Sequence, residues 1–476
     1  MHGATDISDM GSKVFLAWVC FVASLAGVLF GFDTAVISGT FGLVEAQYAL
    51  DKIEVGWFAS SALVGAILGA AVSGFLSDRY GRKPILMLAA TLFFFSALGS
   101  TIPPNFQLLI LARLIGGLGV GMASVLAPLY ISEIAPPKIR GRLVALYQFS
   151  IVVGILLAYF SNWIILGYAP LGSAVGEATW LDKILRGEVW RAMFGSEMIP
   201  SGLFLILLYF IPESPRWMIK NGQDKKGYEV LVQISGRASA SRELVEIKHS
   251  VEQLKGNIRE LFRPGLRLAL LVGVGLSVFG QFSGVNIIIY YGPTILEGAG
   301  FKLESALQFQ VAIGMINLLF TIIALWKIDH WGRRPLLIGG MMAVTISLVI
   351  IAVQFSLGKT DGIWIVIMLC VYMASLAISI NAVIWVLMGE IFPTRIRGRA
   401  MAIATFANWG TNFLTAFLFP WYVERIGMGA GFFTFSIMCL FAVLFFYKFV
   451  PETKGKSLEE IEQYWAERRS TEKYSN

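Results

Sequence analysis

The sequence predicts an all-α membrane protein in which twelve transmembrane helices form two pseudo-symmetric six-helix bundles, with short cytoplasmic helices between them. Three observations predict this fold. Apolar residues make up 56% of the 476 residues and charged residues only 14%, whereas charged residues are about a quarter of an ordinary soluble chain. The apolar residues are gathered into runs of membrane length. Two polar cassettes also occur twice, at matching places in the two halves of the chain.

The repeated cassettes show that the second half of the chain resembles the first. The stretch DRYGRKP at 78–84 returns as DHWGRRP at 329–335, and EIAPPKIRGR at 133–142 returns as EIFPTRIRGR at 390–399. Two similar membrane bundles, each with polar elbows in the same places, explain such a repeat.

Each predicted span is an apolar run long enough to cross a bilayer. The first run is too long for the apolar core of a signal peptide and is counted as a span. The twelve runs lie near 14–40, 54–77, 85–102, 107–132, 142–166, 189–211, 267–296, 305–328, 336–357, 363–390, 399–422 and 429–450.

Lys and Arg concentrate in the loops that follow the even-numbered spans, which predicts that these loops and both termini are cytoplasmic. The predicted parts are an N-terminal bundle (1–211), cytoplasmic linker helices (212–266), a C-terminal bundle (267–450) and a cytoplasmic tail (451–476). The linker carries apolar residues at helical spacing, including Leu231, Ile234, Leu244 and Ile247. The net charge of +7 fits loops that face anionic lipid, and no nucleic-acid partner is expected.

Three charged residues lie deep inside predicted spans, where charge is costly and usually functional. Asp33, Arg113 and Glu197 fall in spans one, four and six, all within roughly 9–12 Å of the outer boundary at about 1.5 Å of rise per residue. An ionised carboxylate holds a neighbouring Arg, and a protonated one releases it. Proton occupancy could therefore bias which of two bundle arrangements is more stable. The alternative is a static pair that only fixes packing.

Uncharged polar and aromatic side chains form a second group within the spans. Each amide alone fits an interhelical hydrogen bond. Together they suit a neutral polyhydroxy solute, because amides both donate and accept and aromatic faces cover the apolar side of a sugar ring. The group comprises Gln148, Gln281, Asn286, Asn317, Asn381, Asn408, Asn412, Trp385, Trp409, Tyr290 and Tyr291.

Enzyme chemistry is not expected. The three cysteines lie in apolar runs, and the three histidines lie outside the deep parts of the spans. The sequence contains no nucleophile–base set, metal cluster or phosphate-cradling loop that we could identify. We therefore expect neither a metal nor a cofactor.

At several points along its length the chain resembles the sugar porters of the major facilitator superfamily, and among them most closely the bacterial D-xylose/proton symporters. The matching motifs are GFDTAVISG at 31–39, DRYGRK at 78–83, PESPRW at 212–217, QFSGVN at 281–286, YYGP at 290–293, EIFPTRIRGR at 390–399 and PETKG at 451–455.

The resemblance implies roles for individual residues. Proton coupling falls on Asp33, Arg113 and Glu197. Sugar contacts fall on Gln148, Gln281, Asn286, Asn317, Trp385, Asn408 and Trp409, to which we add Tyr291 because of its aromatic face. A cytoplasmic gate falls on Glu133, Arg142, Glu390, Arg399, Arg82 and Arg333.

The chain departs from the family pattern at two places beside the expected sugar pocket. The usual Gln-Gln of span seven is Gly280-Gln281, and the usual Gly-Pro of span ten is Asn381-Ala382. A hexose or a polyol therefore stays open beside a pentose. Because a proline removes a backbone hydrogen bond, its loss predicts a stiffer span ten.

The sequence thus predicts a secondary transporter that imports a monosaccharide with a proton by alternating access. It is expected to work in the cell membrane as a monomer, with the sugar, the proton and the lipid bilayer as its partners. A uniporter of the same fold, which would not use protons, is the first alternative. A membrane sugar sensor is the second, and the short tail after the last span argues against it.

Overall fold

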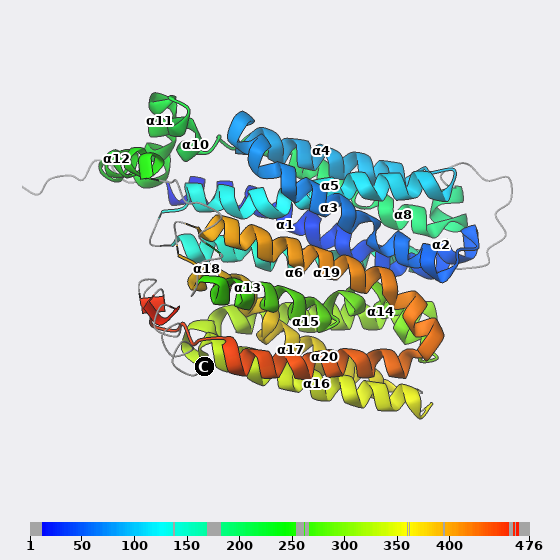
Figure 1. Ribbon diagram of the computed structural model, residues 1–476. Coiled ribbons are helices and arrows are strands. Elements are labelled where there is room, and N and C mark those ends of the chain that lie inside the picture. Colours follow the sequence, from blue (N-terminus) through cyan, green and yellow to red (C-terminus); the bar gives the residue numbers. More distant parts are fainter. Residues whose placement is uncertain are drawn as a thin grey trace, which may run out of the picture. The chain divides into compact units, whose positions relative to one another are not determined.

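The computed structural model describes residues 12–136, 139–168, 182–253, 261, 266–358, 360, 362–393, 396–456, 460–461 and 463–465. Over these residues the regular structure is helical, without strands, as predicted (Figure 1). Eleven stretches of helix among them are long and apolar enough to cross a membrane.

The first six predicted spans all correspond to helices. Span six is divided in two, and two short elements, α2 (Phe41–Tyr48) and the π-helical η3 (Lys183–Gly187), lie between spans. The spans are α1 (Lys13–Val36) with η2 (Ile37–Gly39), α3 (Lys52–Tyr80), α4 (Arg82–Thr101), α5 (Phe106–Ile134), α6 (Arg140–Tyr168), and α8 (Val189–Gly195) with α9 (Met198–Leu208).

The last six predicted spans also correspond to helices, and among them spans seven and ten are divided. They are α13 (Leu266–Phe282) with α14 (Val285–Gly298), α15 (Leu303–Trp331), α16 (Arg333–Ser356), α17 (Ile363–Ile378) with α18 (Ile380–Ile391), α19 (Arg397–Ile426) and α20 (Met428–Phe449). Of the predicted spans, α19 is the one outside the eleven apolar stretches. Its buried Asn408 and Asn412 make it more polar than its neighbours.

The sequence pattern predicted loops at the cassettes 78–84 and 329–335. The structure has single-residue corners between long helices there instead. Only Gly81 separates α3 from α4, and only Gly332 separates α15 from α16. Their φ angles are +104° and +85°, in the region that L side chains rarely adopt. Glycine therefore ends one helix and starts the next without an intervening loop.

The described helices pack into two compact units. The first contains Met1–Val36, Ser61–Ser161 and Tyr168–Leu254, and the second contains Ile37–Ser60, Asn162–Gly167 and Lys255–Asn476. The second unit thus includes η2, α2 and short ends of α3 and α6. Within it, the Phe41 ring stacks on Tyr291 at 4.5 Å between centroids. Gly56 lies so close to Phe417 that an added Cβ would come within 2.0 Å of that residue's carbonyl oxygen.

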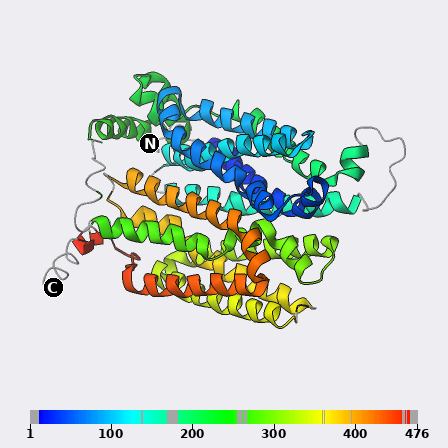
Figure 2. The ribbon, with the colours of Figure 1, turned by 45° about the vertical axis from the view of Figure 1, so that its right-hand side comes forward.

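The short helices predicted between the halves are present in the first unit (Figure 2). They are α10 (Pro215–Lys220), α11 (Asp224–Ser235) and α12 (Arg237–Gln253). Ile219, Leu231, Ala240 and Ile247 form their small apolar core, with Leu244 packed against it. Three of these positions are among those that the helical spacing had indicated. This small apolar core is therefore what holds α10, α11 and α12 together.

Span ten is interrupted at one residue although Asn381-Ala382 stands where the Gly-Pro pair was expected, and the stiffness expected of this span stays a prediction. The interruption lies at Ser379, where φ is −95° and ψ is −106°. Gly340 of α16 packs against it, and a Cβ at position 340 would come within 2.2 Å of the Ser379 Cβ. The kink is therefore accompanied by close approach to a neighbouring helix rather than by a missing amide hydrogen.

We predict that Gly340→Ala destabilises the protein by about 1–3 kcal/mol, because the added methyl overpacks the contact with Ser379. The neighbouring Gly339 has no atom within 4 Å of its Cβ position. Gly339→Ala should therefore be neutral or slightly stabilising, since Ala is the better helix former. Thermal unfolding in detergent checks both changes, and equal melting temperatures for the two variants would contradict this explanation of the kink.

Candidate functional site

Two of the three deep charges form a buried ion pair in the first unit. Asp33 on α1 and Arg113 on α5 are each 2% exposed. The Arg113 Nη1 lies 2.6 Å from Asp33 Oδ1, and Nη2 donates a longer bond of 3.4 Å to the Asp33 carbonyl. Partly desolvated charges at this distance interact far more strongly than they would in water.

Glu197 lies at the break between α8 and α9 and is 1% exposed. It interacts electrostatically with both Asp33 and Arg113. Its Oε1 has no hydrogen-bond partner among the described residues. The Arg113 guanidinium also lies 5.4 Å from the centroid of the Phe194 ring, just before this break. The three predicted coupling residues therefore belong to one electrostatic cluster. Within it, Arg113 contacts Asp33 of α1 and Phe194 of α8.

Small side chains make room for this cluster. An added Cβ at Gly116, one turn from Arg113, would come within 2.4 Å of Ser96 Oγ and 3.4 Å of Asp33 Oδ1. Ser96 donates its own hydroxyl hydrogen to the Ala112 carbonyl at 2.8 Å. Close packing of α4 and α5 thus brings the backbone of α5 up to the Asp33 carboxylate.

Three of the predicted sugar ligands form a chain of amides in the second unit. Gln281 at the end of α13 donates through Nε2 to Asn408 Oδ1 on α19 at 2.9 Å. Asn286 at the start of α14 donates through Nδ2 to Gln281 Oε1 at 2.7 Å. Their remaining lone pairs and N–H groups can both accept and donate, which is the chemistry that hydroxyl groups require.

The other predicted ligands differ in their burial and in whether their polar atoms already have hydrogen-bond partners. Asn317 is buried on α15, and its Oδ1 has no partner among the described residues. Trp385 is 37% exposed on α18, whereas Trp409 is buried. Tyr291 donates its hydroxyl hydrogen to the Ala416 carbonyl at 2.9 Å, so that hydrogen is already used. Gln148 is half-buried on α6 in the first unit.

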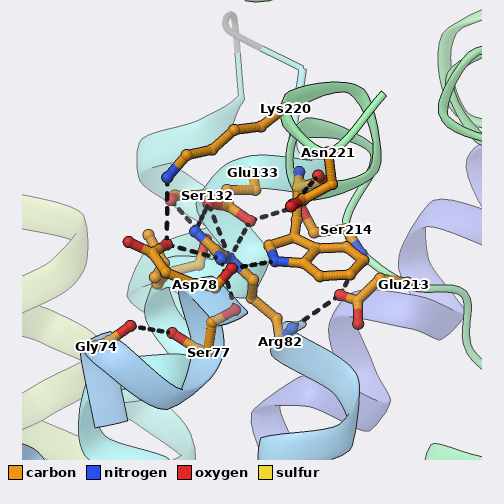
Figure 3. Close-up of polar contacts among 12 residues, drawn as sticks. Gly74, Ser77, Asp78, Arg82, Ser132, Glu133, Glu213, Ser214, Lys220 and Asn221 are labelled. Carbon is orange, nitrogen blue, oxygen red and sulfur yellow. Dashed lines mark hydrogen bonds and ion pairs between the residues drawn. The ribbon is translucent and has the colours of Figure 1, made fainter. Parts of the chain in front are cut away.

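The predicted gate residues Arg82 and Glu133 form an ion pair at one elbow of the first unit (Figure 3). The Arg82 Nε and Nη2 each reach Glu133 Oε1 or Oε2 at 3.0 Å, and Nη1 reaches Asp78 Oδ1 at 3.0 Å. Ser214 donates its hydroxyl hydrogen to Glu133. Lys220 lies 3.5 Å from Asp78. The Arg82–Glu133 pair therefore joins the cassettes at 78–84 and 133–142, and the segment that follows span six contacts both of them.

The second unit repeats this arrangement with equivalent residues. Arg333 Nη2 lies 2.9 Å from Glu390 Oε1, and Thr453 donates to Glu390 Oε2 at 2.6 Å. Lys454 donates to the carbonyl of His330, at the end of α15. The side chain of Asp329, the counterpart of Asp78, lies outside the described residues. We call the two arrangements the elbow clusters.

Two carboxylates that the sequence analysis gave no role complete the elbow clusters. Glu213 accepts the backbone N–H groups of Arg82 and Lys83 at 3.0–3.3 Å, and Glu452 accepts those of Arg333 and Arg334 at 3.1 Å. They cap the N-termini of α4 and α16, whose own N-cap residues are the side-chain-free Gly81 and Gly332. The repeated Pro-Glu-Ser and Pro-Glu-Thr at 212–214 and 451–453 were the signal for them.

Glycine at the corner also leaves space for this remote cap. A Cβ at Gly81 would come within 2.2 Å of Glu213 Oε2, and one at Gly332 within 2.7 Å of Glu452 Oε2. Burial raises the pKa of the Glu213 carboxyl above its ordinary value, although the N–H bonds from residues 214, 83 and 82 and the Arg82 charge act in the opposite direction.

The predicted gate residues Arg142 and Arg399 are exposed, and no ion pair joins either of them to another described residue. The nearby cations that contact the backbone are Arg140 and Arg397. Their Nε atoms donate to the carbonyls of Ala135 at 3.3 Å and Phe392 at 3.2 Å. These bonds cap the ends of α5 and α18 at equivalent places in the repeat.

The apolar helices of the described residues, with a buried ion pair inside two of them, are typical of a multi-pass membrane protein. The chain matches the family model described as "Sugar (and other) transporter" over residues 19–465 and belongs to that family. It is 39% identical to the D-xylose-proton symporter of Escherichia coli K12, over 94% of this chain and 95% of that protein. It is 38% identical to the arabinose-proton symporter of Bacillus subtilis, over 95% and 96%.

Solved structures agree with the family assignment. The xylose transporter XylE from E. coli, in an inward open conformation, is similar with a TM-score of 0.81 at 37% identity. The match covers 94% of this chain and all of that chain. The fold is therefore that of the major facilitator superfamily, with twelve transmembrane helices.

We predict that Glu213→Ala lowers the free energy of unfolding by about 1–2 kcal/mol, because the first amides of α4 lose their acceptor. Glu213→Gln should lose less, since its amide oxygen still accepts. Thermal unfolding in detergent measures the change, with Glu229→Ala on the exposed side of α11 as the control. Equal melting temperatures for Glu213→Ala and the control would contradict the capping role.

Proposed function

We propose that this chain imports a monosaccharide together with a proton by alternating access. The moving parts are a bundle of residues 1–211 and a bundle of residues 267–450, linked by cytoplasmic helices at 212–266 and followed by a cytoplasmic tail at 451–476. The protein acts as a monomer in the cell membrane, with both termini in the cytoplasm. The observation that carries the proposal is the buried contact between Asp33 and Arg113.

Asp33 is the proton acceptor in this mechanism. With Asp33 ionised, the 2.6 Å contact to Arg113 ties α1 to α5. Protonation removes the negative charge and weakens this tie, so Arg113 can turn toward Glu197, with which it already interacts. The bundle then has a different lowest-energy arrangement with and without the proton, as coupling requires.

The substrate is a neutral sugar held chiefly by the amide chain of the second bundle. Gln281, Asn286 and Asn408 supply donors and acceptors, and Trp385 supplies an exposed aromatic face. A neutral ligand fits because Gln281, Asn286 and Asn408 are joined by amide–amide hydrogen bonds, and none of these three groups is a cation that would hold a phosphate or carboxylate. The relatives named as D-xylose and arabinose symporters favour a pentose such as D-xylose, and a hexose is the other candidate.

Alternating access requires contacts that open in turn. In the second unit, Phe41 and the beginning of α3 pack against Tyr291 and α19, and these contacts must separate before sugar can arrive from outside. The elbow clusters of Arg82–Glu133 and Arg333–Glu390 lie at the cytoplasmic ends in the proposed topology. Their rearrangement accompanies release of the sugar to the cytoplasm.

Asp33→Asn should abolish sugar accumulation driven by a pH gradient while sugar exchange at equal concentrations persists. The amide cannot cycle between a charged and a neutral state. Uptake and counterflow of labelled D-xylose, arabinose and D-glucose in proteoliposomes measure the two activities. Asp51→Asn, an exposed carboxylate outside the proposed site, is the matched control. Undiminished pH-driven accumulation by the Asp33→Asn variant would refute the proton assignment, and insensitivity of the unaltered protein to pH would favour a uniporter.

Gln281→Ala should weaken sugar binding by about 1–3 kcal/mol, because substrate hydroxyls and the neighbouring amides lose a buried partner. Calorimetric titration with the transported sugar measures the dissociation constant. Gln308→Ala changes an exposed residue of the same type on α15 and should leave it unaltered. A constant that Gln281→Ala does not move would remove Gln281 from the sugar site.

A further inference from the structure

The break in span seven lies next to the amide chain. α13 ends at Phe282, and α14 begins at Val285. Gly284 between them has a φ of +83°, and its N–H donates to the Gln281 carbonyl at 3.0 Å. Helical bonding resumes where the Ile288 N–H donates to the Gly284 carbonyl. The Ser283 carbonyl has no backbone donor among the described residues, so the break leaves this oxygen without a helical partner.

Tyr372 satisfies that carbonyl. This fully buried residue of α17 donates its hydroxyl hydrogen to the Ser283 oxygen at 2.8 Å. An unpartnered carbonyl within a membrane is costly, so the bond favours this particular broken geometry. Gly284 leaves space for it, since a Cβ there would lie 3.3 Å from the Tyr372 hydroxyl oxygen. One side chain from another span therefore secures the break.

The geometry of the break determines where the amides lie. Gln281 and Asn286 stand on opposite sides of it and are joined by the 2.7 Å bond from Asn286 Nδ2 to Gln281 Oε1. A change in the angle between α13 and α14 would separate these two groups. It would also alter the approach of Gln281 to Asn408, at present 2.9 Å.

We propose that Tyr372 is a positioning residue for sugar recognition, acting through the break in span seven rather than by touching the sugar. This inference rests on the proposed function, in which the amide chain binds the sugar. Loss of the hydroxyl leaves the Ser283 carbonyl unpartnered, loosens the start of α14 and spreads the amides. The substitution leaves the Asp33–Arg113 contact in place, because that pair belongs to the first unit and Tyr372 to the second.

The test is Tyr372→Phe, which removes the hydroxyl and keeps the ring. We expect the dissociation constant and the KM for the transported sugar among D-xylose, arabinose and D-glucose to rise about five- to tenfold. The pH midpoint of uptake should stay as it is. Amide hydrogen exchange over residues 283–288 should be about threefold faster, as expected of a loosened local structure. Tyr422→Phe is the matched control, since it removes a hydroxyl bonded to Thr434 between α19 and α20.

A dissociation constant that matches the control within twofold would overturn the proposal, even with a lowered melting temperature, because Tyr372 would then serve stability alone. Unchanged exchange over residues 283–288 would overturn it as well. If the unaltered protein binds none of the three sugars, the proposed function fails and the positioning role fails with it. Faster exchange in Tyr372→Phe would in that case still identify the hydroxyl as the group that holds the break.

Discussion

The contact between Asp33 and Arg113 is the interaction on which the rest of the site depends. Two opposite charges, each 2% exposed, are held 2.6 Å apart between α1 and α5, within apolar parts of these helices. Either charge alone in this position would be strongly destabilising, and a buried pair contributes little to stability compared with apolar packing. Its presence is better explained by a function in which one partner changes its charge. Glu197 and the break before α9 give Arg113 a second place to interact.

The groups that carry charge and the groups that suit a sugar are unevenly distributed. Asp33, Arg113 and Glu197 belong to the first unit, whereas the amide chain and Trp385 belong to the second. Among the predicted sugar ligands, Gln148 belongs to the first unit. Coupling in the proposed mechanism therefore requires a movement that both sets of groups influence. The divided helices suit such movement, because α8–α9, α13–α14 and α17–α18 are each interrupted within a span.

The sequence was sufficient for features that depend on composition and spacing. Apolar runs predicted the spans, and isolated charges within them identified the Asp33–Arg113 pair, because a bilayer excludes unpaired charge whatever the tertiary structure. The doubled cassettes indicated matching elbows. Features that depend on contacts between distant segments could not be predicted. The sequence pattern predicted loops at Gly81 and Gly332, because it does not show that the distant Glu213 and Glu452 cap the helices that follow. Span ten breaks at Ser379 beside Gly340, and it contains no proline from which the break could have been predicted.

Proton movement driven by sugar tests the central claim most directly. Proteoliposomes with a pH-sensitive dye inside, and no initial pH gradient, would receive the sugar that the protein binds. The account predicts that the lumen acidifies as sugar enters, and that the acidification is lost in Asp33→Asn while sugar still equilibrates. Sugar influx without any acidification in the unaltered protein would contradict it.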